Sequence, residues 1–139
     1  MLNQMEINVI QKAVSNFDGI TKLVLDGVGC PSIEFSKHNN GIEVESIRID
    51  TLVEHSGIPC PDYAVIDAEG AELAVLSGMV KTLRKRKTTI LVEVHWLGDK
   101  FLEFFEEIIK PLGYTIENLT GEEMPSEPIR WHALLKPIA

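Results

Sequence analysis

The sequence lacks an apolar run long enough to span a membrane. A helix needs about 20 consecutive apolar residues to cross a bilayer, and none of the apolar stretches in these 139 residues approaches that length. The polar amino-terminal residues, MLNQMEINVIQK, also lack the charged and then apolar layout of a signal peptide. We therefore expect no membrane partner and a cytoplasmic location.

Basic residues are scarce. The chain has 13 Lys and Arg against 21 Asp and Glu, which gives a formal net charge of -8. Nucleic-acid surfaces depend on clustered Lys and Arg, so we expect no nucleic-acid partner. One basic cluster, KTLRKRK at 81–87, falls at the end of a predicted helix, where cations complement the helix dipole. We interpret it as a solvated helix end, with an anion or RNA site as the alternative.

Cysteine is also rare. Cys30 and Cys60 form no CxxC pair, so neither a zinc site nor a thioredoxin-like motif is indicated. We expect reduced, structural cysteines, and a disulfide between them stays open because sequence does not show whether the sulfurs meet.

Length and composition favour one domain over residues 1–139. With 45% hydrophobic residues, the chain can bury a single core and is too short for two. Residues 1–49 are predicted to be mainly β, with strands at 6–14, 20–26 and 42–49 and a short extended piece at 33–35. Residues 50–139 are predicted to form an α/β half of a larger fold.

The second part alternates strands and helices. Asp50 is expected to cap a short helix at 51–56. The elements that follow are a strand at 62–67, a helix at 71–83, a strand at 88–94, a helix from 99 to about 111, and strands at 114–119 and 129–135. This order predicts an α/β fold with a doubly wound, mostly parallel sheet. The closing pair of strands predicts one antiparallel strand at the edge.

Acidic side chains gather where two predicted strands end. Asp67, Glu69 and Glu72 follow a buried strand, and Glu93 and His95 close the next one. Glu93 and His95 should share a face because they are two residues apart. Ligands of α/β proteins collect at the carboxyl ends of strands. The candidate catalytic residues are therefore Asp67, Glu69, Glu93 and His95.

Each candidate also has a structural interpretation. Asp67 and Glu69 would suit the start of a helix without any catalysis. Glu72 is expected to cap Glu69 or Gly70 and to be structural. His95 fits a core histidine as well as a catalytic one, and Trp96 fits a core or rim aromatic better than a pocket lining.

The same acids and histidine are donor types that divalent metals accept. Their spacing shows no metal-specific signature, and one acid could simply hydrogen-bond the histidine. We therefore assign no metal ligands from the sequence.

Several segments resemble the C-terminal half of the FkbM-type methyltransferases, which use S-adenosylmethionine. The main ones are IDAEGAELAVLSGM at 66–79, ILVEVH at 90–95, LGYTIENL at 112–119 and HALLKP at 132–137. Weaker matches upstream are VIQKAVSNFDG at 9–19 and SIRIDTLVEHSG at 46–57. The DxEGxE element is the most specific of these.

The resemblance implies a partial class I methyltransferase fold, which is Rossmann-like, and O-methyl transfer to a small-molecule hydroxyl acceptor, often a sugar or polyketide. In complete relatives Asp67 would face the methyl donor and the acceptor hydroxyl. There it would act as a base or orient the nucleophile, with the Glu93 and His95 pair as the alternative.

The donor-binding elements of the family are not matched. A class I methyltransferase binds its cofactor with a glycine-rich loop after the first strand, and that loop belongs before the point where this chain begins. Gly27 and Gly29 lack a third glycine and a following helix, so we interpret them as structural. Cofactor-binding residues stay unassigned, and the activity of this chain alone stays open. The alternative is a non-catalytic, truncated or partner-dependent subunit that keeps only the substrate half.

The family's sheet places the unmatched first strand beside the strand that ends at Asp67. Without that strand an apolar edge would be open and liable to pair with another chain. The resemblance therefore predicts a homodimer or a complementing chain at this edge.

Overall fold

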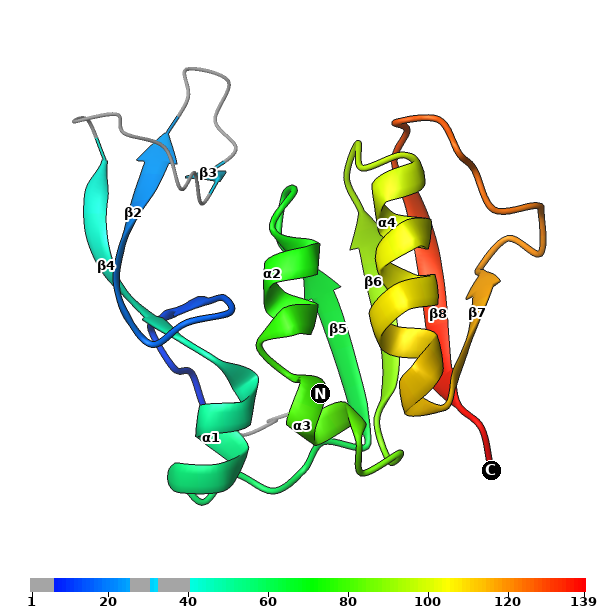
Figure 1. Ribbon diagram of the computed structural model, residues 1–139. Helices are drawn as coiled ribbons and strands as arrows, with labels where there is room; N and C mark the ends of the chain where they lie inside the picture. The colour runs from blue at the N-terminus through cyan, green and yellow to red at the C-terminus, as the bar shows by residue number, and fades with distance from the viewer. Residues whose placement is uncertain (1–6, 26–30, 33–40) are drawn as a thin grey trace, which may run out of the picture.

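The computed structural model describes residues 7–25, 31–32 and 41–139 (Figure 1). Two four-stranded sheets form in this part of the chain. The strands are β1 Ala13–Val14, β2 Gly19–Leu25, β3 Pro31–Ser32, β4 Ile42–Ile47, β5 Tyr63–Asp67, β6 Thr89–Val94, β7 Tyr114–Asn118 and β8 Trp131–Pro137. The helices are α1 Ile49–His55, α2 Glu72–Ser77, α3 Val80–Leu83 and α4 Asp99–Phe104, followed by a π-helical turn η1 Phe105–Ile109 and a 3₁₀ turn η2 Lys110–Leu112.

Some expectations fall outside the described residues. These are the extended piece at 33–35, the glycines Gly27 and Gly29, and Cys30. Cys60 is a free cysteine. None of the described helices is long and apolar enough to cross a membrane.

The first sheet has the strand order β1-β4-β2-β3 and is mixed. β1 pairs with β4 in parallel, whereas β2 pairs with β4 and with β3 antiparallel. The strand predicted at 6–14 is reduced to its last two residues, because residues 7–12 are exposed and their alternation reflects no buried face. The strands expected at 20–26 and 42–49 are present with slightly shifted bounds.

The second sheet has the order β5-β6-β8-β7 and is mixed. Only β5 and β6 pair in parallel, and β8 runs antiparallel to both β6 and β7. The predicted antiparallel strand therefore lies inside the sheet and not at its edge. Ala133 and Leu135 of β8 are fully buried, which suits an inner strand, whereas β7 exposes Thr115 and Glu117 and takes the edge.

Helices α2 and α4 lie over one face of this sheet (Figure 1). The core between the layers consists of Ile66, Val75, Leu76, Met79, Leu83, Ile90, Val92, Val94, Phe101, Phe105, Ile109, Tyr114, Trp131, Ala133 and Leu135. β5 forms the other edge of the sheet, and its alternate side chains Tyr63 and Val65 are 80% and 75% exposed. The sheet therefore ends in an apolar strand whose side chains on one face are largely exposed.

The helix predicted at 71–83 is divided into α2 and α3 at Gly78. A Cβ atom at Gly78 would lie 2.1 Å from the carbonyl oxygen of Ser15, so only glycine fits at this close approach. The break holds the amino-terminal strand region against the helical layer.

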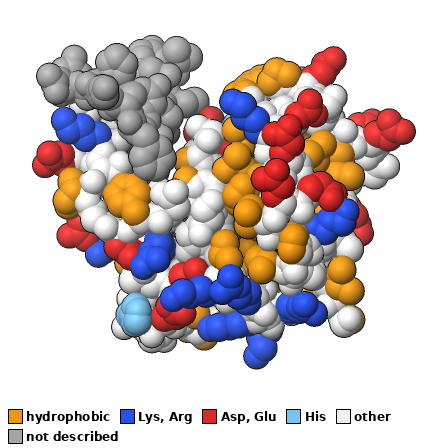
Figure 2. Space-filling model, viewed as in Figure 1, with side chains coloured by type: hydrophobic (Ala, Val, Ile, Leu, Met, Phe, Trp, Pro, Cys, Tyr) orange, Lys and Arg blue, Asp and Glu red, His pale blue; other side chains and the backbone are white. Residues whose placement is uncertain are grey.

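All the basic residues of 81–87 are exposed, whereas Thr82 and Leu83 in the same segment are buried. Figure 2 shows basic side chains gathered at the end of the molecule where α1 and α3 lie. The solvated interpretation of this cluster agrees with their exposure.

The prediction that Asp50 caps the helix at 51–56 is wrong. It lies inside the first turn of α1 and is buried, and its carboxylate accepts hydrogen bonds from the amides of Lys81 and Thr82 at 3.0 and 2.8 Å. The Thr82 hydroxyl donates a third bond at 2.8 Å. Asp50 therefore caps α3 and ties it to α1, a long-range contact that local spacing does not reveal.

Asp50→Ala tests this link. We expect the substitution to lower the free energy of unfolding by about 2–4 kcal/mol, because the amides of Lys81 and Thr82 and the Thr82 hydroxyl lose their carboxylate acceptor. Urea unfolding measures the change. Glu103→Ala, at an exposed position of α4, is the control and should shift stability by less than about 0.5 kcal/mol. Equal stability of the two variants would show that the Asp50 contacts contribute nothing.

Candidate functional site

The candidate site lies at the carboxyl ends of β5 and β6. These strands are parallel neighbours, and their register places Asp67 directly beside Glu93. Carboxyl ends of parallel strands meet at one edge of a sheet, which is where α/β proteins bind ligands. The sequence prediction that the two strand ends lie together is confirmed.

Tight turns follow both strands. Glu69 has a φ of 46° and Gly70 a φ of 98° after β5, and Trp96 has a φ of 55° after β6. The left-handed conformation costs a residue with a side chain about 1–2 kcal/mol. Such backbone strain is often found at functional sites.

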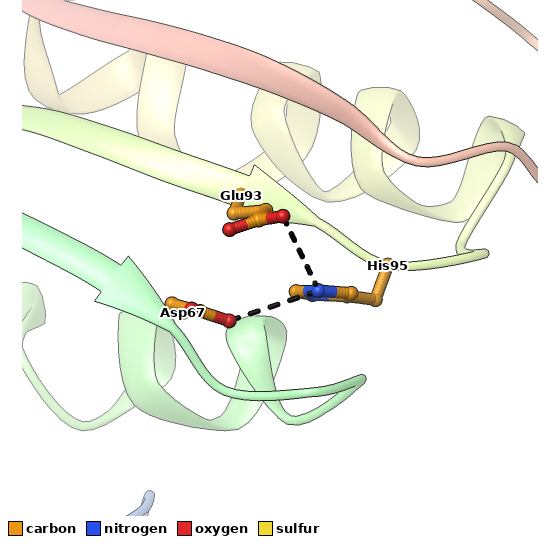
Figure 3. Close-up of side chains that lie close together, drawn as sticks. All are labelled: Asp67, Glu93 and His95. Atoms are coloured by element: carbon orange, nitrogen blue, oxygen red, sulfur yellow. Dashed lines mark ion pairs between the residues drawn. The ribbon is translucent and has the colours of Figure 1, made fainter. Parts of the chain in front are cut away.

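His95 is the centre of the group. Its side chain is 2% exposed, and its Nε2 lies 3.7 Å from one carboxylate oxygen each of Asp67, Glu69 and Glu93. Figure 3 shows the imidazole pointing between Asp67 and Glu93. These distances are too long for hydrogen bonds, and Nε2 is buried without a hydrogen-bond partner. The structure thus brings the four predicted residues together, with Asp67, Glu69 and Glu93 around Nε2 of His95.

Glu72 fixes the orientation of this imidazole. It is fully buried at the start of α2, and its Oε1 accepts the Gly70 amide at 3.0 Å and lies 2.7 Å from His95 Nδ1. Because a carboxylate only accepts, we assign the proton to Nδ1 and the lone pair to Nε2. The predicted cap on Gly70 is confirmed. Sequence reasoning missed the bond from His95, since only the three-dimensional fold brings α2 beside the end of β6.

Arg130 was also missed. It forms a salt bridge and a hydrogen bond with Glu93 Oε1. Desolvation raises the pKa of Glu93, but the hydrogen bond and charge of Arg130 outweigh it, so the pKa lies below its ordinary value. Arg130 directly precedes β8, which pairs with β6. The contact could have been predicted only if β8 had been known to pair with β6.

Two clefts adjoin the strand ends. One of about 620 Å³ is lined by Asp67 and Glu69 together with residues 10–14, Leu23 and Val44 of the first sheet. The other, of about 380 Å³, is mainly apolar and runs along β5 between α1 and the strand. Trp96 is 65% exposed, which excludes the core interpretation, and it does not line either cleft. The cleft beside Asp67 and Glu69 has a volume typical of small-molecule sites.

The fold and the strand-end acids together define an α/β unit with a polar site at the carboxyl ends of two parallel strands. A family model described as the methyltransferase FkbM domain matches residues 2–118. The chain therefore belongs to the FkbM methyltransferase domain family.

A crystal structure of the methyltransferase FkbM from Methylobacillus flagellatus KT is similar to this chain. The TM-score is 0.46 and the sequence identity 16%, over 67% of this chain and 23% of that chain. This chain thus covers less than a quarter of that relative's length. No curated protein matches the chain.

The family implies S-adenosylmethionine, but the described residues do not form a donor site. Class I cofactor loops present glycine amides between a strand and a helix. The turn after β5 carries carboxylates with a single glycine, Gly70, and the turn after β6 carries only Gly98. We therefore derive no chemical step through the donor.

Glu72→Ala tests the buried contact at the centre of the site. We expect it to lower the free energy of unfolding by about 3–5 kcal/mol, because it leaves the His95 Nδ1 proton buried without an acceptor. Glu72→Gln keeps an accepting oxygen and should cost less. Chemical unfolding of both variants is compared with Glu107→Ala, an exposed position. A loss no larger for Glu72→Ala than for Glu107→Ala would contradict the assigned contact.

Proposed function

We propose that this chain supplies the acceptor side of an S-adenosylmethionine-dependent O-methyltransferase. The observation that carries the proposal is the gathering of Asp67, Glu69 and Glu93 around His95 Nε2 at the carboxyl ends of β5 and β6. Membership of the FkbM family and the cleft beside Asp67 and Glu69 support it. The acceptor would be a small molecule that presents a hydroxyl group.

Methyl transfer to oxygen requires a hydroxyl that is held in line and relieved of its proton. Asp67 is half exposed and lines the larger cleft, so its carboxylate can accept a hydrogen bond from the acceptor hydroxyl. Glu93 lies beside Asp67 on the neighbouring strand, and His95 Nε2 lies 3.7 Å from the Asp67 carboxylate. In this proposal Asp67 orients the hydroxyl and accepts its proton as the general base, with Glu69, Glu93 and His95 beside it.

The donor would be bound by a part of the fold outside the described residues. β5 is an edge strand of the described sheet. The cleft beside it is almost entirely apolar, with α1 on one side and β5 on the other. An open strand edge with an apolar groove suits an added strand. We propose that a strand of the donor-binding part pairs with β5 there.

A second candidate function is a non-catalytic, partner-dependent subunit. The observation that favours it is the terminal position of β5 in the described sheet, together with described turns that form no donor loop. In this case the edge would be covered by a homodimer or by a complementing chain, and the acids would bind an acceptor without transferring a methyl group.

Calorimetric titration with S-adenosylmethionine addresses where the donor binds. We expect no micromolar binding by this chain alone, because the strand-to-helix turns among the described residues lack the glycine amides that hold the donor. Micromolar binding by the isolated chain would contradict both the proposed division of the site and the subunit alternative.

A methyl-transfer assay with hydroxyl acceptors, run with the product of the adjoining coding sequence present, separates the two candidates. Asp67→Asn should reduce kcat by about 100-fold, the scale of a lost positioned acid or base. Asp62→Asn, at an exposed position before the other end of β5, is the matched control and should leave kcat unchanged. Full activity of Asp67→Asn would contradict the assigned role, and donor binding without any transfer would favour the non-catalytic subunit.

A further inference from the structure

His95 Nε2 is buried, and the atoms that face it are carboxylate oxygens, which are hydrogen-bond acceptors. The nitrogen has no hydrogen-bond partner, its side chain is almost fully buried, and three carboxylates face it at 3.7 Å. With the proton on Nδ1, a lone pair meets negative oxygens, which is unfavourable unless a positive charge lies between them. This arrangement calls for a cation.

A second proton on His95 would be one source of positive charge. A protonated Nε2 would donate a charge-assisted hydrogen bond to a carboxylate at about 2.7–2.9 Å. The nearest oxygens of Asp67, Glu69 and Glu93 all lie 3.7 Å away. Nε2 therefore forms no hydrogen bond with any of these carboxylates.

The distances of 3.7 Å from His95 Nε2 to Asp67 and to Glu93 fit donor atoms that share one ion. Ligating atoms of Asp67, Glu93 and His95 all lie within 4.8 Å of one another. Two donors that each lie about 2.0–2.2 Å from an ion are separated by roughly 3–4 Å across ordinary coordination angles. Figure 3 shows the two carboxylates and the imidazole converging on a common point.

Glu72 completes the pattern on the far side of the ring. Histidines that bind metals usually donate their other N–H to a carboxylate, which fixes the tautomer and makes the ligating nitrogen more basic. His95 Nδ1 and the buried Glu72 Oε1 stand in that relation at 2.7 Å. This contact is independent of the acidic cluster itself, because Glu72 lies on α2 and faces away from the converging oxygens.

We propose that His95 Nε2, Asp67 and Glu93 bind one divalent first-row transition-metal ion, such as Mn²⁺ or Zn²⁺, with Glu69 as a neighbouring fourth donor. An imidazole nitrogen favours these ions over Mg²⁺ and Ca²⁺, which take oxygen donors. The ion would sit where the proposed function places the acceptor hydroxyl. Its binding is measured without donor or acceptor, so its failure would leave the methyltransferase proposal standing.

Arg130 is the competing cation. Its guanidinium pairs with Glu93 Oε1, the same oxygen that faces His95 Nε2. An ion must share or displace this contact. Removing Arg130 should therefore strengthen metal binding, which a merely structural role of the cluster does not predict.

Isothermal titration calorimetry with MnCl₂, ZnCl₂ and CaCl₂ on the wild-type chain tests the site. We expect one equivalent of Mn²⁺ or Zn²⁺ to bind, and Ca²⁺ to bind at least about tenfold more weakly. Asp67→Asn and Glu93→Gln should each weaken binding by at least about tenfold, and Arg130→Gln should tighten it several-fold. His95→Gln should abolish it, with circular dichroism confirming that the variant folds.

Matched controls come from exposed positions. Asp99→Asn, Glu107→Gln and His55→Gln make the same chemical changes away from the site and should leave binding unchanged. Three results would overturn the proposal. They are the absence of Mn²⁺ and Zn²⁺ binding, binding that the Asp67 and Glu93 variants do not alter, and Ca²⁺ binding as tight as that of Zn²⁺.

Discussion

The buried hydrogen bond between Glu72 and His95 is the contact on which the site depends. Both side chains are almost completely removed from solvent, and the bond joins α2 to the end of β6 at 2.7 Å. It sets which ring nitrogen faces the strand-end acids. Without it, the acids would surround an imidazole free to turn, and a cation among them would not meet a defined nitrogen.

Much of the fold could be predicted from the chain because the signals were local. Apolar runs located β5 and β6, and a three-to-four-residue stripe located the helices over them. The inner position of β8 and the α3 cap by Asp50 could not be predicted, since both depend on long-range pairing. The helix break at Gly78 was missed because its cause, the Ser15 carbonyl, lies more than sixty residues away along the chain.

The acidic residues of the candidate site could be predicted from the sequence, but their contacts with Arg130 and His95 could not. Asp67 and Glu93 end neighbouring parallel strands, so their proximity followed from the strand rule. Arg130 pairs with Glu93, and that contact required knowledge of the strand order. Glu72 was expected to cap a turn, which it does, but the same oxygen also holds His95.

The tautomer of His95 tests the account most directly. Long-range ¹H–¹⁵N NMR correlations distinguish a protonated ring nitrogen from a bare one. The account predicts a proton on Nδ1, where Glu72 accepts it, and a bare Nε2 facing Asp67, Glu69 and Glu93. A proton on Nε2 with a bare Nδ1 would contradict it, because the acids would then face a donor and the case for a cation among them would fall.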